Sequence, residues 1–343
     1  MTDQPSHAAA PPLARAATIL LVGAGAVGAR TARQLVETPG VGTVVIADRD
    51  SARADRVAEA VGPRATVVTY RVGDALPAGV DAVANALPGD AALRLVDAAI
   101  AAGCPTAVAS DAPDTLDALL TRDAAARAAA VPVVGGCGLA PGISDVLVCH
   151  AASSFDSVEE IFVARAGVAG SASEVAMRRA RREPAVEVSD GRVREARRPG
   201  EELVWFPDPI GPIECEPVAP GVQLLHDAFG DVRRIGIRFG EVPGRRWWQR
   251  ADPAGGWGAT RVEVWGTRGS GRAAVVYGVV ERTAIAAGTL LALTTVGLLG
   301  VVPVMTGVEP GVQGVAAVAD PLPFLGELAR RGVKAAVFDG MGA

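Results

Sequence analysis

Residues 23–28, GAGAVG, constrain this chain more than any other feature, because they separate an apolar run from a helical pattern. The run from Thr18 to Val22 is typical of a buried strand, and the helical pattern continues to Val36. In such a turn the first glycine allows a tight bend, the second lets a phosphate approach the backbone, and the third lets the helix pack on the strand. The helix N-terminus adds unpaired amides and a favourable dipole. We therefore predict a pyrophosphate site on Gly23, Ala24, Gly25, Ala26, Val27 and Gly28.

A second apolar run, from Thr43 to Ala47, ends at Asp48, twenty positions after Gly28. A carboxylate at this place accepts hydrogen bonds from the hydroxyls of an adenosine ribose and repels a 2′-phosphate, which favours NAD. Arg49 argues the other way, because a guanidinium beside the ribose can pair with that phosphate. The sequence thus predicts NAD or NADP as the cofactor, with NAD favoured.

Alternating strand and helix patterns predict a Rossmann fold, an α/β doubly wound parallel sheet, over residues 16–145, after a loose tail at 1–15. The expected helices are 51–61, 91–102 and 115–130, and the expected strands are 66–70, 82–86, 106–109 and 131–134. Over 146–283, β-branched runs at 160–165, 233–239, 261–265 and 273–280 follow one another without helices, which predicts an α+β mixed-sheet substrate domain. Residues 284–343 are expected to be helical and to pack back on the first domain.

Composition excludes several classes of function. The formal net charge of -5 argues against nucleic-acid binding. The four cysteines show no CxxC spacing, and the N-terminus lacks a signal-peptide pattern, which together favour the reducing cytoplasm. Residues 285–305 carry no charge and are long enough to span a bilayer, but glycines and a proline interrupt them, so we expect a buried segment and no membrane. No cysteine and histidine cluster has zinc-ligand spacing, and no metal is expected.

Scarce lysine and tyrosine exclude further enzyme classes. Lys334 is the only lysine, and neither tyrosine is followed by a lysine four residues later, so catalytic lysines and the Tyr and Lys pair of short-chain dehydrogenases are excluded. Two strand ends remain as candidates for the nicotinamide side of the site. One is Ser110, and the other is the segment of residues 85–88. That segment consists of Asn85, Ala86, Leu87 and Pro88, and for Asn85 alone a plain turn is the alternative interpretation.

Three titratable side chains are candidates for proton transfer. Asp111 follows the fifth strand and either binds a substrate ammonium and relays a proton, or caps the next helix. His150 and His226 have the proton-shuttle chemistry, with a structural role as the alternative. Arginines of the second domain could bind a substrate carboxylate, namely Arg165, Arg238, Arg245, Arg246 and Arg250.

The segment at residues 136–145, GCGLAPGISD, is similar to the GxxPG(I/L/M)(S/T)(N/D) segment of the saccharopine dehydrogenase-like family, especially its lysine 6-dehydrogenase and saccharopine reductase branches. Residues 47–49, 277–288 and 325–332 extend the resemblance. It implies NAD(P)-dependent oxidation or reduction at a carbon–nitrogen bond of an amine, imine or amino acid. Apart from the resemblance, we expect a cytoplasmic protein that binds a small-molecule substrate and forms a homo-oligomer, a dimer. The segment would line the substrate cleft or serve as a structural elbow between the domains. Cys137 is either a candidate for the chemistry in that cleft or a small buried apolar side chain. The lining candidates are Cys137, Gly138, Leu139, Pro141, Gly142 and Asp145.

Two departures put a lysine substrate in doubt. Residues 314–320 lack the PE pair that relatives carry after a late GV, and residues 281–283 differ from the aromatic and acidic pattern of the lysine dehydrogenases. Two alternatives therefore remain open: a nucleotide-binding sensor or scaffold without turnover, and a reductase of a carbon–carbon double bond.

Overall fold

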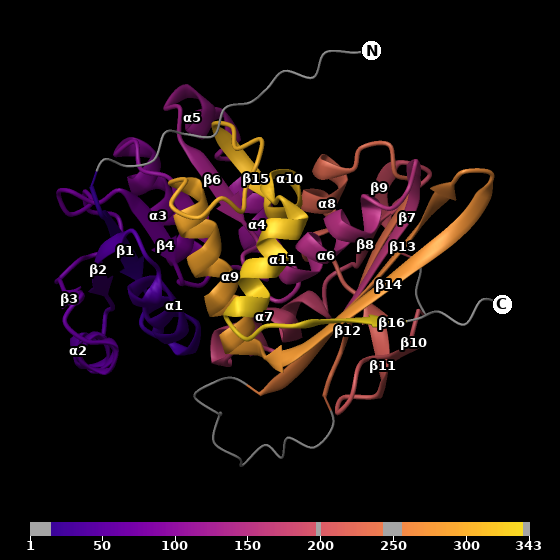
Figure 1. Ribbon diagram of the computed structural model, residues 1–343, viewed down its shortest axis with the longest axis horizontal. Helices are drawn as coiled ribbons and strands as arrows, with labels where there is room; N and C mark the ends of the chain where they lie inside the picture. Colours follow the sequence, from indigo (N-terminus) through magenta and orange to yellow (C-terminus); the bar gives the residue numbers. More distant parts are fainter. Residues whose placement is uncertain (1–14, 197–199, 243–255, 339–343) are drawn as a thin grey trace.

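The computed structural model describes residues 15–196, 200–242 and 256–338, and it forms two β-sheets with helices between them (Figure 1). The first sheet is parallel throughout, in the order β15-β6-β5-β4-β1-β2-β3. Its first six strands have the 3-2-1-4-5-6 order of a Rossmann fold, which confirms the predicted doubly wound sheet. Its strands are β1 Ala17–Val22, β2 Val41–Ala47, β3 Ala65–Val67, β4 Ala82–Asn85, β5 Thr106–Val108, β6 Pro132–Gly135 and β15 Gly311–Gly314.

The helices of this domain begin and end close to the predicted positions. One prediction is wrong: the single helix expected over 115–130 is two helices, with a break at Thr121 and Arg122. There the Thr121 hydroxyl and the Arg122 guanidinium both donate to the carbonyl of Ala118, which closes the first helix. The helices are α1 Ala26–Glu37, α2 Ser51–Val61, α3 Gly89–Ala101, α4 Pro113–Leu120 and α5 Asp123–Ala128.

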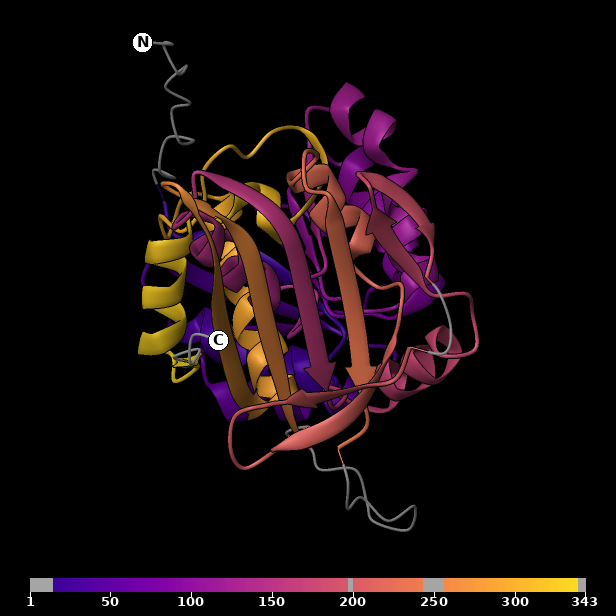
Figure 2. The ribbon, with the colours of Figure 1, turned by 90° about the vertical axis from the view of Figure 1, so that its right-hand side faces the viewer.

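The second sheet is mixed, as predicted, with the path β10-β11-β12-β7-β13-β14-β16 and the strands β8 and β9 attached beside β12. Among its described strands, β12 and β7 are the one pair that runs in parallel, and the other pairs are antiparallel. In Figure 2 one of its faces is turned to the viewer and carries no helix over the central strands. Its strands are β7 Ser157–Ala166, β8 Val186–Ser189, β9 Arg192–Glu195, β10 Glu202–Trp205, β11 Pro212–Pro217, β12 Arg234–Gly240, β13 Trp257–Arg268, β14 Gly271–Arg282 and β16 Ala335–Phe338.

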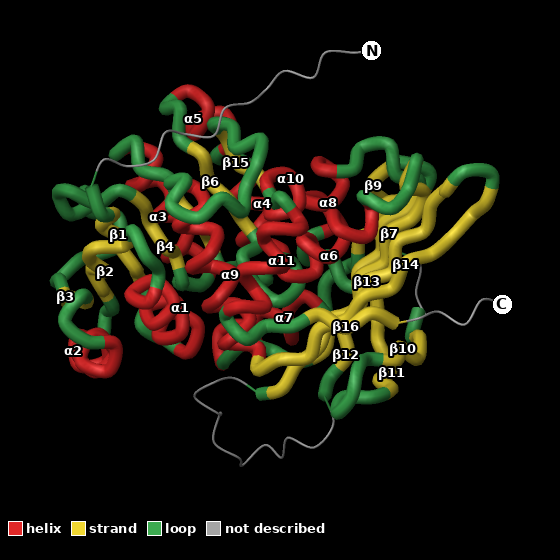
Figure 3. The backbone as a smooth tube through the Cα atoms, in the orientation of Figure 1, coloured by secondary structure: helices red, strands yellow, loops and turns green. Residues whose placement is uncertain are grey.

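Helices fill the space between the two sheets (Figure 3). They are α6 Ile143–Ala152, α7 Ser171–Ala180, α8 Val222–Ala228, α9 Thr283–Leu298, α10 Val315–Val318 and α11 Pro321–Arg330. The chain after α9 contributes a strand to each sheet, because β15 pairs with β6 and β16 pairs with β14. Pattern reasoning treated this segment as helical and missed both strands, since each is four residues long and is fixed by a partner far away in the sequence.

The uncharged segment near residue 290 is explained by α9, which is buried along almost its whole length. Leu290, Leu291 and Leu293 are fully buried, and each contributes about 2 kcal/mol of hydrophobic stabilisation. Gly288 is required where α9 crosses α1, because a Cβ there would lie 2.6 Å from the Arg30 Cβ. No described helix is long and apolar enough to cross a membrane.

Candidate active site at the carboxyl edge of the first sheet

The loop between β1 and α1 has the geometry of a phosphate-binding turn. Gly23 has a φ of +99°, and a Cβ on Gly28 would lie 1.7 Å from the Gly23 carbonyl oxygen, so both positions require glycine. Gly25 differs, because a Cβ there would meet no protein atom within 4 Å. It is the N-cap of α1 and makes no side-chain cap, which leaves the first amides of the helix for an outside acceptor. The loop therefore fits a dinucleotide pyrophosphate.

Asp48 is tied directly to this loop. Its Oδ2 accepts a hydrogen bond from the Ala24 amide at 2.7 Å, and its Oδ1 accepts one from the Asp50 amide at 2.9 Å. Arg49 is exposed, and the Arg53 guanidinium lies 3.9 Å from Asp48 Oδ2. Sequence reasoning missed Arg53, which follows the strand by one helical turn and reaches back over the acid. Both a carboxylate and two arginines thus flank the place where an adenosine ribose would lie.

Asn85 shapes the loop after β4. Its side chain is fully buried, its Nδ2 donates to the Ala92 carbonyl at 2.9 Å, and its Oδ1 accepts from the Leu87 amide at 3.1 Å. Ala86 lies against the glycine loop, because its carbonyl oxygen would be 2.8 Å from a Cβ on Gly23, and Pro88 is the N-cap of α3. The polar groups of Asn85 are therefore used within the protein, and the loop backbone faces the cofactor loop.

Asp111 joins the two domains, because the second domain supplies both of its side-chain partners. Arg165 of β7 donates from Nη2 to Asp111 Oδ2 at 2.9 Å, and the Ser173 hydroxyl of α7 donates to the same oxygen. The guanidinium also donates to the carbonyls of Ala140 and Gly167. Asp111 does not cap helix α4, because the N-cap residue is Ala112 and no side chain makes a capping hydrogen bond there. Neighbouring Ser110 is buried, and its Oγ accepts from the Ala112 amide at 3.4 Å.

One oxygen of Asp111 remains open. Within the described residues Oδ1 has no hydrogen-bond partner, and the side chain is 20% exposed, whereas that of Arg165 is only 4% exposed. The carboxylate is thus anchored on one side by a buried cation and accessible on the other. This is a suitable arrangement for binding a cation or accepting a proton.

Helix α7 lies across the carboxyl edge of the first sheet. At its start, a Cβ on Gly170 would lie 4.0 Å from the Ala26 Cβ of the glycine loop. Ser173 then bonds Asp111, and Arg179 pairs with Asp114 of α4 at 3.1 Å. The second domain therefore covers the edge from α1 to α4, and the glycine loop and Asp111 lie under the same helix.

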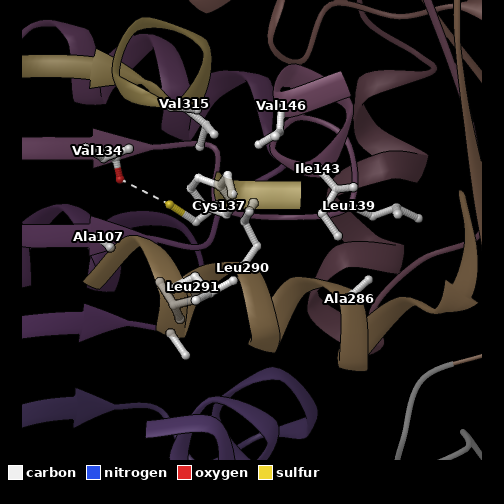
Figure 4. Packing of buried hydrophobic residues seen from close by; sticks show 14 of the residues in the cluster. Ala107, Val134, Cys137, Leu139, Ile143, Val146, Ala286, Leu290, Leu291 and Val315 are labelled. Atoms are coloured by element: carbon white, nitrogen blue, oxygen red, sulfur yellow. Dashed lines mark hydrogen bonds between the residues drawn. The ribbon is translucent and has the colours of Figure 1, made fainter. Parts of the chain in front are cut away.

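The loop at residues 136–142 is a tight turn, and much of it is buried. The Gly138 amide donates to the Pro141 carbonyl at 3.0 Å, and Gly142, with a φ of +128°, would place a Cβ 2.3 Å from the Gly138 carbonyl oxygen. Leu139 is 5% exposed. The fully buried Cys137 packs among apolar side chains, and its Sγ contacts the Val134 carbonyl (Figure 4). Burial raises the pKa of Cys137 to about 12, so it is a small apolar side chain and presents no thiolate to a cleft.

Asp145 is also buried, in the first turn of α6. Desolvation raises the pKa of its carboxyl to about 7, against a hydrogen bond from the Ser144 hydroxyl at 2.9 Å that lowers it. Its Oδ2 has no partner among the described residues. Neither Ser144 nor Asp145 caps the helix, whose N-cap is Gly142. Asp145 is thus enclosed by the protein, with only 1% of its surface exposed.

Neither histidine contacts Asp111 in the described part of the chain. His150 is on α6 and stacks on Tyr277 of β14, with ring centroids 5.3 Å apart. His226 is on α8, and its neighbour Asp227 accepts a hydrogen bond from Gln223. The Nδ1 atom of each histidine is buried without a partner in the described residues. Among the candidate arginines, Arg238 pairs with Glu202, while Arg245, Arg246 and Arg250 lie outside the described residues.

Two cavities lie away from the carboxyl edge. The larger, of about 470 Å³, is on the helix-free face of the second sheet, where its arginines pair with Glu160, Glu202 and Glu263. The smaller, of about 320 Å³, lies between α6, β14 and α11 and includes His150 and Tyr277 in its lining. The described residues contain no cluster that could hold a metal ion.

Comparison with known proteins agrees with this geometry. Residues 19–133 match the family model of the saccharopine dehydrogenase NADP binding domain. The fold is similar to that of apo saccharopine dehydrogenase (L-Glu forming) from Saccharomyces cerevisiae, with a TM-score of 0.66, 13% identity, and coverage of 94% of this chain and 100% of that one. It is also similar to an amine dehydrogenase from Mycobacterium smegmatis (TM-score 0.52, 11% identity, coverage 88% and 96%) and to C. glutamicum DAP dehydrogenase in complex with DAP (0.51, 14%, 93% and 99%).

The sheet order, the glycine loop and the family match define an NAD(P)-dependent dehydrogenase. More particularly, its nucleotide-binding domain is saccharopine dehydrogenase-like, which confirms the family resemblance seen in the sequence. The expected nicotinamide dinucleotide cofactor follows from the same match.

Proposed function

We propose that this protein transfers a hydride between a nicotinamide dinucleotide and a carbon–nitrogen bond of an amine, imine or amino-acid substrate. The observation that supports this most is the open Oδ1 of Asp111, at the same sheet edge as the glycine loop. Amines and imines are cationic when protonated, and a fixed carboxylate is the partner such a substrate needs in a desolvated site. The similar folds of an amine dehydrogenase and a DAP dehydrogenase agree with this substrate class.

The bound cofactor would supply the hydride acceptor or donor. In the oxidative direction a protonated amine gives its proton to Asp111, which frees the nitrogen lone pair. Hydride departure from the adjacent carbon then leaves a carbon–nitrogen double bond in an iminium ion. In the reductive direction the iminium accepts the hydride, and the amine recovers its proton from Asp111. Arg165 and Ser173 hold Asp111 in place through Oδ2, so that Oδ1 faces the substrate throughout.

The glycine loop would hold the pyrophosphate on the amides that begin α1, and Asp48 would hold the adenosine ribose. We propose that NAD is preferred, because the Asp48 carboxylate is fixed beside the loop and would repel a 2′-phosphate. Arg49 and Arg53 are the residues that would bind that phosphate if NADP were the cofactor.

The substitution Asp111→Asn tests the proposal. It keeps the shape of the side chain but removes the negative charge and the proton acceptor, so we expect kcat/KM for amine oxidation to fall by about 100-fold or more. The affinity for NADH should not change. The matched control is Asp114→Asn, three residues later on α4, whose exposed carboxylate pairs with the surface residue Arg179 and accepts hydrogen bonds from its neighbour Thr115.

Substrates are found by following NAD(P)H absorbance over a panel of amines, amino acids and their imines, with enones included. Turnover on the nitrogen substrates and its loss in Asp111→Asn would support the proposal. Near-normal turnover in Asp111→Asn, turnover on enones alone, or cofactor binding without turnover on any compound would contradict it. The last result would favour a nucleotide sensor.

A further inference from the structure

The cavity between α6, β14 and α11 contains three unpaired hydrogen-bond donors in otherwise apolar surroundings. Its polar lining consists of His150, Tyr277 and Lys334. The remaining lining residues are Ile143, Leu147, Val279, Leu325, Leu328, Ala329, Val333 and Ala335. A volume of about 320 Å³ is at the lower end of the range of small-molecule sites.

None of the three polar groups has a partner among the described residues. His150 Nδ1 is buried without a hydrogen bond, and neither the Tyr277 hydroxyl nor the Lys334 ammonium makes a hydrogen bond or ion pair there. A ligand in the cavity cannot reach Nδ1, which has almost no accessible surface. The other ring nitrogen of His150, Nε2, is accessible and has no hydrogen-bond partner among the described residues, so it can donate to a ligand atom in the cavity. Stacking on Tyr277 fixes the orientation of the His150 ring.

The charges around the cavity select an anion. Lys334 is exposed beside the cavity and is the only lysine of the chain, and no acidic residue lines the site within the part of the chain that the structure describes. An ammonium, a phenol and an imidazole N–H all donate, so they suit an acceptor with several lone pairs, such as a carboxylate. The aliphatic side chains deeper in the cavity suit an apolar body attached to that carboxylate.

We propose that this cavity binds a small apolar carboxylic acid, with its carboxylate on Lys334, Tyr277 and His150 and its hydrocarbon part against α6 and α11. The site shares no residue with the glycine loop, Asp111 or Arg165. It is therefore a second site, and it stands independently of the hydride transfer proposed above. Its floor includes Ile143, the first residue of α6, which directly follows the turn at residues 136–142.

Titration of the full-length protein with phenylacetate tests this proposal. The matched probes are 2-phenylethylamine, which has the same apolar body and the opposite charge, and neutral 2-phenylethanol. Binding is measured by calorimetry and by the shift of the His150 ring-proton NMR signals, which are assigned by their loss in His150→Gln. We expect phenylacetate to bind and to move these signals, and the amine to leave them unchanged.

Three variants make the test specific. Lys334→Gln should weaken phenylacetate binding about tenfold, because a hydrogen bond to a charged group is lost, whereas Lys334→Arg keeps the charge and should retain binding. Leu325→Trp fills the cavity from its partly buried edge and should weaken binding at least about tenfold. NADH affinity, measured on each variant, confirms that the fold is intact.

The proposal is overturned if the amine or the alcohol binds as well as the acid, or if phenylacetate fails to bind at about 10 mM, far above the roughly 1 mM of a weak complex. It is also overturned if Leu325→Trp binds phenylacetate as tightly as the unmodified protein while keeping its NADH affinity.

Discussion

Replacing Gly25 by valine should remove cofactor binding and leave the fold intact. A Cβ at this position meets no protein atom within 4 Å, and the backbone, with φ -72° and ψ -165°, is extended and open to any residue. The loss of unfolding free energy should be no more than about 1 kcal/mol, the usual cost of a poor N-cap residue. The side chain would instead occupy the space for the pyrophosphate. Loss of about two charged hydrogen bonds to backbone amides corresponds to at least about 100-fold weaker binding.

Gly28→Val is the matched contrast, because it lies on the same loop but faces the protein. A Cβ there would lie 1.7 Å from the Gly23 carbonyl oxygen, so the loop must move at a cost of about 3 kcal/mol. Urea unfolding and calorimetry with NADH, run on both variants, give the two quantities for each. The reasoning is refuted if Gly25→Val binds NADH as the unmodified protein does, or if it loses as much stability as Gly28→Val.

Two further substitutions test the electrostatics of the first domain. Burial raises the folded-state pKa of Asp145 to about 7 from 3.8, so folding favours its protonated form and its contribution to stability is lost as pH rises from about 4 to about 7. We compare the unfolding free energy of Asp145→Asn with that of the unmodified protein by urea unfolding at about pH 5 and about pH 8. The difference should shift by about 3 kcal/mol in favour of the variant between these two pH values. An equal difference at both pH values would contradict this. Asp48→Ser removes the charge beside the ribose and leaves Arg49 and Arg53, so the NADPH to NADH affinity ratio should rise about tenfold in fluorescence titrations, and an unchanged ratio would count against the role of Asp48.

The sequence predicted the first sheet and the cofactor loop because both depend on local patterns. A strand followed by GAGAVG and a helix can be recognised without knowing the rest of the fold, and Asp48 follows at a fixed spacing. The small strands β8 to β11, β15 and β16 were not predicted. Each has six residues or fewer, and its pairing partner rather than its own composition decides its conformation.

The candidate site was predictable only in part. Sequence spacing placed Asp111 at the sheet edge, and Arg165 was one of several possible arginines, but nothing local shows that these two residues pair across 54 positions. Ser173 and Arg53 carried no signal, since an isolated serine or arginine is ordinary on a helix. Cys137 and Asp145 belong to the recognised segment yet are buried, because such a motif also contains the residues that hold the turn together.

Calorimetric titration of the purified protein with NADH and NADPH tests the central claim most directly. Because the glycine loop, the start of α1 and Asp48 together form a dinucleotide site, at least one of the two cofactors should bind with one-to-one stoichiometry, and Gly25→Val should abolish that binding. If neither cofactor binds, in its reduced or its oxidised form, the assignment of this edge of the sheet as a dehydrogenase site is wrong.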